Sequence, residues 1–510
     1  MPAQSVRAVV LAAGKSTRFK RKKSKLLSKI CGREMVLFPL KILEKFKIPV
    51  ALVLGYQADE IKEIVEKSCA VPVDYFLQHE RLGTGDAVLC SQEKWDQDNI
   101  LILNGDVPLL TPEIIEDLLT RHEQEQATIS FIATRMINPT GYGRVVEENE
   151  KIKIIEEKDC PEKFREINKV NAGIYVIKRS FLEESINKLQ KSSVSGEFYL
   201  TDLVALASDQ GLKVQVVLAA FDAVRGVNTL QELWAVEQVM RSNLIKHWMN
   251  NGVRFELAQS IHIDIEVEIG PDSFIGTGAH ILNGTKIGEG CFVAAFTILE
   301  NTTVGDETTI HSHSVIQDSR IGNEVHIGPF ARLRNNVVIA DNATVGNFVE
   351  IKNSSIGSKS KVKHLAYLGD TTVGKNVNIG AGTIVCNYDG FTKKPTILED
   401  DVFIGSNNTL VAPLIIGKGA YSAAGSTITR DIPSGDLAIA RARQENKAGY
   451  AKKLKNKKII SKAESVSQLE CKKKDNLKFH FLGAVKTSSV KTGSVKTGSV
   501  ETNGKSEDRL

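Results

Sequence analysis

The chain of 510 residues is long enough for about three domains, and its 42% hydrophobic and 25% charged residues are ordinary for a globular protein. Its formal net charge of +5 is small for this length, which argues against a dedicated nucleic-acid-binding protein with a basic stripe over a whole domain. No apolar run reaches membrane-spanning length, so we expect no membrane insertion.

The cysteines and the first residues bear on the cellular compartment. Seven cysteines are scattered along the chain without CxxC spacing, which predicts neither a disulfide framework nor a zinc site. The opening MPAQSVRAVVLAAG lacks the basic start and the long apolar stretch of a secretory signal. We therefore expect a cytoplasmic protein.

Residues 1–229 alternate apolar runs with amphipathic stretches. The runs RAVVLAAG, PVALVLGY and NILILNGD have the pattern of buried strands, and MVLFPLKILEKF, ADEIKEIVEK and TPEIIEDLLTRHEQ that of intervening helices. This alternation predicts an α/β domain, Rossmann-like, with a mostly parallel sheet covered on both faces. Ligands of such sheets bind at the carboxyl ends of the strands, where LAAG and NGDVP lie.

A basic run follows the first strand: LAAGKSTRFKRKKSK, residues 11–25, has seven Lys or Arg among its last eleven positions. Such a run is compatible with nucleic acid, a nuclear address, a membrane surface or a phosphate-rich substrate. The glycine allows a sharp turn after which Lys15, Thr17 and Arg18 can face bound phosphates. The GxxxxGK spacing of a P-loop is absent.

Two oxygen-bearing residues suggest a metal near these phosphates. Asp106 in NGDVP ends a buried strand, where a carboxylate needs a cation or metal, or else caps a turn. Asn228 in GVNT lies on a loop before the next helix and offers an amide oxygen. Together with substrate phosphates they could complete a magnesium site, although spacing alone does not show that they meet.

Residues 230–250 predict one amphipathic helix that links two domains. Beyond it, Ile-Gly or Val-Gly recurs at multiples of about six residues, as in IGPDSF, IGTGAH, IGEGCF and IGAGTI. This hexapeptide repeat predicts a left-handed parallel β-helix over residues 251–451, with one aliphatic side chain pointing inward from each short strand. Flat outer faces of such a coil favour a homo-oligomer. The basic, low-complexity tail, residues 452–510, is expected to be disordered.

The motifs of the first domain resemble those of the nucleotidyltransferase half of bacterial bifunctional UDP-N-acetylglucosamine pyrophosphorylases that are also glucosamine-1-phosphate N-acetyltransferases. The matching segments are LAAGKSTR with Lys25, LQHERLGTGDA, NGDVPLL, PTGYGR, IIEEKD, VNAGIY, GEFYLTD and GVN. The resemblance implies that Arg18 and Lys25 act on the triphosphate, and that UTP and the sugar contact Leu11, Ala12, Gly14, Gln78, Gly83, Thr84, Asp106, Gly143, Glu156, Asn171 and Asn228. Of these, Gln78, Gly83 and Thr84 would bind the uracil, and Asp106 and Asn228 would hold one or two Mg²⁺ ions.

The interruptions of the repeat resemble the acetyltransferase half of the same family. An amine nucleophile must lose a proton before it reacts, which calls for a general base such as histidine, and His364 in KHLAYLGD is the candidate. By the resemblance, the substrate-binding residues are Arg334, Lys352, Tyr367, Asn378, Tyr388 and Lys393, and the acetyl-CoA groove is lined by Ala381, Asn387, Ser406, Ala424 and Arg441.

The resemblance, which extends to about residue 451, implies a bifunctional homotrimer. It would transfer acetyl from acetyl-CoA to glucosamine-1-phosphate and then uridylyl from UTP to N-acetylglucosamine-1-phosphate, supplying cell-envelope precursors. Two alternatives are a single-activity sugar-1-phosphate nucleotidyltransferase with a structural β-helix and a non-catalytic pyrophosphorylase-like regulatory subunit. The sequence departs from the family pattern at three positions: Ser16 replaces a glycine, Ser24 a proline, and Arg225 a common acid.

Overall fold

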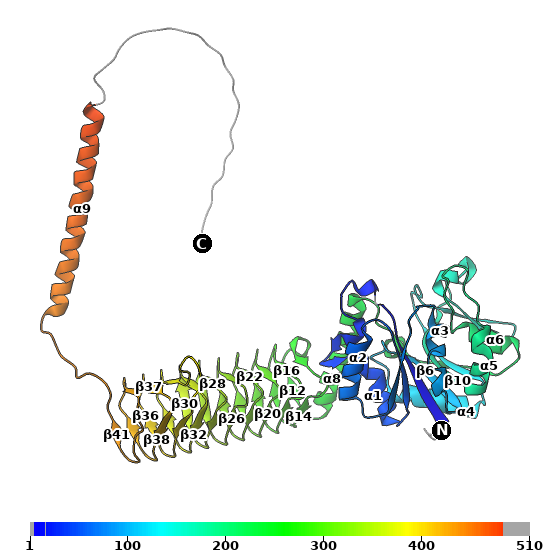
Figure 1. Cartoon of the computed structure of the whole chain (residues 1–510), viewed down its shortest axis with the longest axis horizontal. Coiled ribbons are helices and arrows are strands. Elements are labelled where there is room, and N and C mark those ends of the chain that lie inside the picture. The colour runs from blue at the N-terminus through cyan, green and yellow to red at the C-terminus, as the bar shows by residue number, and fades with distance from the viewer. Residues whose placement is uncertain (1–4, 16, 483–510) are drawn as a thin grey trace, which may run out of the picture. The chain divides into compact units, whose positions relative to one another are not determined.

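A computed structural model describes residues 5–15 and 17–482. The chain falls into two compact units, residues 1–441 and 442–510. The first contains a mixed sheet with helices on both faces and then a long stack of short parallel strands (Figure 1). Ser16, one of the three departures from the family pattern, lies outside the described residues.

The mixed sheet confirms the expected mostly parallel arrangement. Its strands, in spatial order, are β11 (Val214–Leu218), β7 (Ile129–Arg135), β10 (Lys169–Lys178), β6 (Asn99–Asn104), β1 (Val6–Ala12), β4 (Val50–Leu54) and β5 (Val73–Leu77). Strand β10 is antiparallel to both of its neighbours, and the other pairs in this order are parallel. A hairpin of β8 (Arg144–Glu148) and β9 (Lys151–Ile155) joins the sheet through β10. Strands β2 (Lys29–Ile30) and β3 (Arg33–Glu34) form a separate small hairpin.

Helices cover both faces of this sheet because side chains alternate along each strand. Strand β1 shows the alternation: Ala8 and Val10 enter one core and Val9 enters the other. The helices of the first core are α1 (Leu37–Lys45), α2 (Ala58–Ser68) and α4 (Pro112–Gln124); those of the second are α3 (Thr84–Leu89), α5 (Arg179–Ser185) and α6 (Asp202–Asp209). Short helical turns are α7 (Phe221–Val224), η2 (Thr17–Phe19), η3 (Lys25–Leu27), η4 (Gln92–Lys94), η5 (Glu157–Asp159), η6 (Glu162–Phe164), η7 (Ile186–Lys188) and η8 (Ala258–Ser260).

Helix α8 (Leu230–Asn250) covers the residues for which the sequence predicts a connecting helix. Thr229 caps it, since its hydroxyl oxygen accepts a hydrogen bond from the Glu232 amide at 3.1 Å. Val236 packs into the core of the mixed sheet, whereas Ile245 packs into the core of the strands that follow. One helix thus contributes to both hydrophobic cores.

The strands after α8 form three parallel sheets that run along a coil, as the hexapeptide repeat predicts for a left-handed β-helix. The first sheet contains β12 (Arg254–Phe255), β15 (Phe274–Ile275), β18 (Phe292–Val293), β21 (Thr309–Ile310), β24 (His326–Ile327), β27 (Thr344–Asn347), β30 (Lys361–His364), β33 (Asn378–Ile379), β36 (Phe403–Ile404), β39 (Tyr421–Ser422) and β41 (Leu437–Ala438). The second contains β13 (His262–Ile263), β16 (His280–Leu282), β19 (Ile298–Glu300), β22 (Val315–Gln317), β25 (Arg332–Arg334), β28 (Glu350–Lys352), β31 (Tyr367–Gly369), β34 (Ile384–Cys386), β37 (Thr409–Val411) and β40 (Thr427–Ile428). The third contains β14 (Glu268–Ile269), β17 (Lys286–Ile287), β20 (Thr303–Val304), β23 (Arg320–Ile321), β26 (Val338–Ile339), β29 (Ser355–Ile356), β32 (Thr371–Val373), β35 (Thr396–Leu398) and β38 (Leu414–Ile416).

Apart from β39, which pairs with β41, neighbouring strands of each sheet of the coil are three apart in the chain, so one turn of the coil is three strands. Inward-facing aliphatic residues such as Ile316, Leu333 and Ile351 stack in register and are fully buried. The core is therefore a column of branched side chains that no single turn could bury alone.

The tail differs from the expected disorder. Helix α9 runs from Tyr450 to Leu482, while the V-K/E-T repeats beyond it lie outside the described residues. The helical segment contains neither Gly nor Pro, and 19 of its 33 residues are Lys, Leu, Ala, Glu or Gln, ten of them Lys, which all favour helix. Low apolar content therefore misled the sequence interpretation here. Within the described part of the chain, no helix is both long and apolar enough to span a bilayer.

The buried His122 of α4 predicts a pH dependence of stability. Burial lowers its pKa from 6.5 to about 4, and its ring contacts Ser130 Oγ at 2.8 Å and Asn99 Oδ1 at 3.0 Å. The unfolded chain takes up a proton on this histidine at higher pH than the folded chain does. The free energy of unfolding should therefore fall by about 3 kcal/mol as pH is lowered from about 6.5 to about 4. Urea unfolding of wild type and His122→Gln across this pH range tests the prediction. If the free energy of unfolding changed with pH by the same amount in both proteins, His122 would not be the cause.

Two candidate active sites

Two adjoining cavities open at the carboxyl ends of β1 and β6. The strands are paired so that Leu11 lies opposite Asn104, and the Gly105 amide donates to the Leu11 carbonyl at 2.9 Å. The cavities measure about 300 and 270 Å³ and share Leu11, Thr84, Asn104 and Asp106 in their walls. Parallel pairing thus brings the residues after two separate strands to one place, as the sequence predicts.

Most of the predicted residues of the first domain line these cavities. The first cavity is lined by Leu11, Ala12, Gly14, Lys25, Gln78, Gly83, Thr84 and Asp106. The second is lined by Leu11, Thr84, Asp106, Gly143, Glu156, Asn171 and Asn228. Arg18 lies in η2, is exposed, and belongs to neither lining. The linings also include residues that the sequence did not single out, among them Arg81, Tyr142, Tyr175, Glu197 and Thr201.

Asp106 and Asn228 converge on one cation. The Lys25 ammonium donates a hydrogen bond to Asp106 Oδ2 and another, of 2.9 Å, to Asn228 Oδ1. The carboxylate and amide oxygens therefore face a common point between the two cavities. Oxygens of these two kinds are ligands that Mg²⁺ accepts, together with water and substrate phosphate. The donor set consequently fits the predicted magnesium ion.

Local caps hold these three residues in position. The Glu232 carboxylate accepts a 2.7 Å hydrogen bond from the backbone N–H of Asn228, and Thr229 caps α8. The loop is therefore fixed to the helix N-terminus. Ser24 caps η3: its hydroxyl oxygen accepts from the Leu26 amide at 3.3 Å, and its own amide donates to Gln57 Oε1. The family's usual proline at this position would lack that amide.

The third departure from the family pattern, Arg225, has its own partners. Its guanidinium lies over the Phe221 ring, 5.1 Å from the centroid, and 3.5 Å from the Asp222 carboxylate. The Phe221 ring in turn makes an edge contact with Tyr142 of the second cavity. Arg225 therefore supports the cavity wall from outside and removes no lining residue.

Glu156 lies in the second cavity. Its Oε1 accepts a 3.0 Å hydrogen bond from the buried Thr201 hydroxyl, and burial raises the pKa of this carboxyl despite that bond. Asn171, which lines the same cavity, donates to the Tyr175 hydroxyl at 2.6 Å, and Gly173, at φ +74°, makes the bulge in β10 between them. Polar groups held in this way suit a sugar with several hydroxyls.

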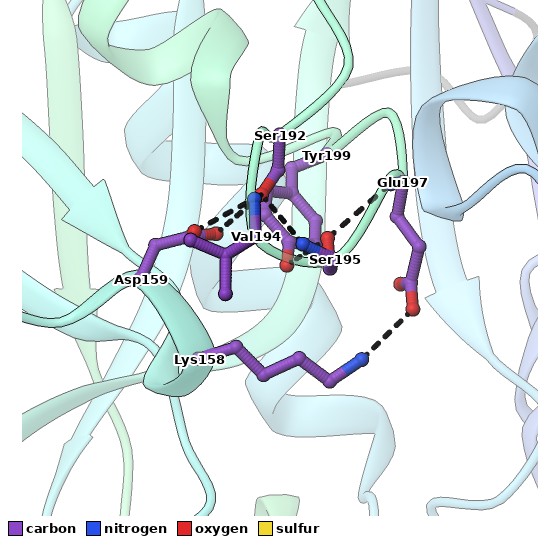
Figure 2. Close-up of polar contacts among 7 residues, drawn as sticks. All are labelled: Lys158, Asp159, Ser192, Val194, Ser195, Glu197 and Tyr199. Carbon is purple, nitrogen blue, oxygen red and sulfur yellow. Dashed lines mark hydrogen bonds and ion pairs between the residues drawn. The ribbon is translucent and has the colours of Figure 1, made fainter.

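Figure 2 shows the polar contacts that fix a loop between α5 and α6. The Ser192 hydroxyl donates to both Asp159 oxygens at 3.0 Å and accepts from the Val194 and Ser195 amides. Tyr199 donates to Ser195 Oγ at 2.6 Å. This network directs Glu197 toward the first cavity and leads the chain to Leu200 and Thr201 in the second.

The same loop constrains the glycine predicted to bind uracil. A Cβ on Gly83, which has φ +113°, would lie 2.4 Å from the Phe198 carbonyl oxygen, so only glycine fits there. The next residue, Thr84, accepts a 3.0 Å hydrogen bond from the Leu200 amide. Gln78 donates to the Gly83 carbonyl at 3.2 Å and to the Asp86 carboxylate at 2.8 Å, which orients its amide.

The second site lies on the surface of the β-helix, around the corner that follows β30. His364 ends β30 and is exposed, and its Nδ1 lies 3.0 Å from Asn347 Oδ1. Asn347 is paired with His364 one turn earlier in the coil. Because an amide oxygen can only accept a hydrogen bond, the His364 Nδ1 must carry the proton. Nε2 is then the basic nitrogen of the ring. The sequence interpretation missed Asn347, although its spacing of one coil turn before His364 could have indicated it.

Cationic side chains lie beside this corner on the second sheet. Arg334 and Lys352 are paired in register, and Arg334 donates to Glu350 Oε1 through Nε at 2.9 Å and Nη2 at 2.7 Å. Lys393, on an insertion between β34 and β35, lies close enough to Lys352 to lower the pKa of the Lys352 ammonium. Such a concentration of positive charge suits a phosphate group.

Asp370 joins the insertion to the coil. It accepts hydrogen bonds from Asn353 and from the buried Asn387. Burial alone would raise its pKa, but these bonds and the charges of Lys352 and Lys393 hold the pKa of Asp370 below its usual value. Within the insertion, Tyr388 donates to the Gly390 carbonyl at 2.6 Å and pairs with Lys393. Two more predicted residues stand on coil strands: Tyr367 opens β31, and Asn378 opens β33.

Four of the five residues predicted to line the acetyl-CoA groove follow one corner of the coil, whereas Asn387 lies elsewhere, after β34 on the second sheet, where it is buried and donates to Asp370. Backbone hydrogen bonds step from turn to turn along it, from Gly382 to His364, from Asn407 to Ala381, and from Gly425 to Ser406. Ala381, Ser406 and Ala424 thus lie on successive turns after His364. Arg441 continues the row, since its Cδ is 4.0 Å from where a Cβ of Gly425 would be. The site is therefore a row of residues along the coil, with His364 at its start.

The fold and the two sites define a nucleotidyltransferase joined to a β-helix. The family model described as nucleotidyl transferase matches residues 7–243. A model described as the GMPPB C-terminal domain matches residues 257–335 and 315–418.

Similar proteins extend over most of the chain. The bifunctional protein GlmU of Thermotoga maritima is 40% identical over 450 residues, which are 88% of this chain and 99% of that protein. Its counterpart in Thermosipho melanesiensis is 41% identical over 446 residues, 87% and 97% of the two chains. That of Clostridium botulinum is 39% identical over 451 residues, 88% and 98%. The chain belongs to the family of the bifunctional protein GlmU, as the sequence motifs predict.

Thr201 should affect the second cavity alone. Thr201→Val keeps the shape of the side chain but removes the hydroxyl that donates to Glu156, so we expect KM for N-acetylglucosamine-1-phosphate to rise roughly tenfold or more. Steady-state kinetics of pyrophosphate release measures it, with Thr201→Ser as the control that retains the hydroxyl. An unchanged KM in the valine variant would show that the bond does not position Glu156.

Asn347 should control the pH dependence of acetyl transfer. Asn347→Asp places a carboxylate on His364 Nδ1, which stabilises the protonated ring and should shift the acidic limb of the kcat/KM profile to higher pH. Asn347→Ala should lower kcat roughly tenfold or more without that shift. Release of free CoA against pH gives both results. A profile that coincides with wild type in the Asp variant would contradict the contact.

Proposed function

We propose that the two cavities of the mixed-sheet domain bind UTP and N-acetylglucosamine-1-phosphate, and that the surface around His364 binds glucosamine-1-phosphate and acetyl-CoA. The enzyme acetylates the amine first and then couples the product to UTP, which gives UDP-N-acetylglucosamine and pyrophosphate. The observation that carries the first half is the convergence of Lys25, Asp106 and Asn228 where the cavities adjoin. Because UTP and acetyl-CoA are cytoplasmic metabolites, we place the enzyme in the cytoplasm.

Uridylyl transfer is an in-line displacement at the α-phosphorus of UTP by a sugar-phosphate oxygen. Glu156, Asn171 and Gly143 orient the sugar, and Gln78, Gly83 and Thr84 bind the uracil. Lys25 stabilises negative charge that spreads over the phosphates, and Arg18 approaches from the exposed turn η2. Asp106 and Asn228 would hold Mg²⁺, which would neutralise phosphate charge. The leaving group is pyrophosphate, and no covalent enzyme intermediate is needed.

Acetyl transfer begins with proton removal at the sugar amine. His364 Nε2 takes that proton while Asn347 keeps Nδ1 protonated and fixes the ring. The amine nitrogen then attacks the acetyl carbonyl carbon, the carbon–sulfur bond breaks, and CoA leaves. Arg334, Lys352 and Lys393 bind the sugar phosphate, and Tyr367, Asn378 and Tyr388 shape the pocket. Acetyl-CoA lies along the row from Ala381 to Ser406, Ala424 and Arg441. Asn387, which follows β34, contributes from the second sheet.

We further propose a homotrimer, with residues 1–229 as the nucleotidyltransferase domain and residues 251–451 as the acetyltransferase domain, joined by 230–250. An exposed column of aromatic side chains on the coil supports this assembly. Phe296, His313, Phe330 and Phe348 stack with centroids 5.0–5.3 Å apart, and the three Phe side chains are 47–55% exposed. Leu365, beside His364, is 61% exposed. Neighbouring copies would cover this surface and complete the acetyl site.

The two activities should be separable by single substitutions. His364→Ala should abolish CoA release yet leave pyrophosphate release from UTP and N-acetylglucosamine-1-phosphate within about twofold of wild type, because the base serves only one reaction. Asp106→Asn, which removes the carboxylate charge, should have the opposite effect.

Each variant is assayed for both products, with circular dichroism and size-exclusion chromatography as controls for folding and assembly. His364→Gln serves as a second, more conservative variant. Loss of both activities in a folded variant would contradict two independent sites. Retention of CoA release in both His364 variants would remove His364 as the base.

A further inference from the structure

The positive charge of the chain is concentrated in the C-terminal segment that contains helix α9. Residues 442–510 contain 17 Lys and Arg against 7 Asp and Glu, whereas the preceding 441 residues contain 49 against 54. The helix alone has ten Lys, no Arg and three acidic residues. The catalytic body is therefore slightly acidic, and the excess of positive charge belongs to a segment that neither reaction uses.

The first third of α9 carries the densest charge. Six lysines fall within eleven residues, which is about 16 Å of helix: Lys452, Lys453, Lys455, Lys457, Lys458 and Lys462. All six are exposed, and within the described residues none of them has an ion-pair partner. Six unpaired like charges so close together repel one another, and an anionic surface relieves that repulsion.

Aliphatic side chains are interspersed among these lysines. Leu454, Ile459 and Ile460 are 53%, 66% and 57% exposed. Lysines and aliphatic residues are distributed around the helix and do not separate onto two faces. A helix of this kind cannot embed one apolar face in a bilayer, but it can lie on a charged surface on any side, with lysine stems and short apolar side chains against it.

We propose that α9 is a docking segment for an anionic lipid bilayer, held there mainly by the six lysines. Three features of the helix favour an anionic bilayer over a nucleic acid. Clusters of four to eight lysines are attracted to anionic lipid, and their attraction needs no specific geometry. The exposed Leu454, Ile459 and Ile460 have a use at a bilayer surface, whereas a nucleic-acid backbone offers them nothing apolar. The absence of Arg from the helix likewise disfavours base and phosphate recognition by bidentate contacts.

The test uses the full chain and vesicles of two compositions: pure phosphatidylcholine, and phosphatidylcholine with about 30% phosphatidylglycerol. We expect sedimentation with the anionic vesicles only, weakened by added salt. Replacing the six lysines by Gln should weaken binding at least about tenfold, whereas replacing them by Arg should preserve it. Both catalytic activities should stay at the wild-type level in either variant, which controls for folding, since α9 belongs to neither site.

A second variant and a second probe separate lipid from nucleic acid. Ile459→Gln with Ile460→Gln should weaken vesicle binding severalfold and leave any binding to a random DNA duplex unchanged. Circular dichroism of each variant checks that the helix persists. The proposal is overturned if wild type does not bind the anionic vesicles at low salt, if the six-Gln variant binds as wild type does, or if DNA is bound more tightly than the vesicles.

Discussion

Parallel strand register is the constraint on which both sites depend. In the mixed sheet, pairing of β1 with β6 places Leu11 opposite Asn104, so the turn after each strand reaches the same cavities. In the β-helix, pairing of β27 with β30 places Asn347 opposite His364. Residues far apart in the chain meet because hydrogen-bonded backbones fix their level along the sheet or the coil.

The regular scaffold supplies positions, and local irregularities supply chemistry. Gly173 forms a bulge in β10 next to Asn171, and Gly83 allows the backbone to approach that of Phe198 closely. In the coil, the insertion between β34 and β35 brings Lys393 and Tyr388 to a surface that regular turns would leave flat. Asp370 ties that insertion to the coil through the buried Asn387. Each departure from the repeat is stabilised by hydrogen bonds of its own.

Much of this organisation could be predicted because it rests on periodicity. Buried strands followed by amphipathic helices indicate a parallel sheet, and the hexapeptide period indicates the coil, whatever the details of packing. Residue chemistry suggested that Asp106 and Asn228 could share a magnesium ion, but spacing does not reveal contacts between loops, and the contact of Lys25 with both residues appears only in the structure.

Residues that act through another residue were missed. Thr201 orients Glu156 and Asn347 orients His364, but neither residue type signals chemistry in isolation. Helix α9 was missed for a different reason: few apolar residues suggested disorder, although the lack of Gly and Pro permits helix without a core.

The central claim is that two sites on one chain act in sequence on one sugar phosphate. The most direct measurement incubates the purified protein with glucosamine-1-phosphate, acetyl-CoA, UTP and Mg²⁺, omits each in turn, and follows free CoA and pyrophosphate separately. We expect pyrophosphate only when acetyl-CoA is present, and CoA release with or without UTP. Pyrophosphate released at the same rate without acetyl-CoA would contradict the order, and release of neither product would contradict both sites.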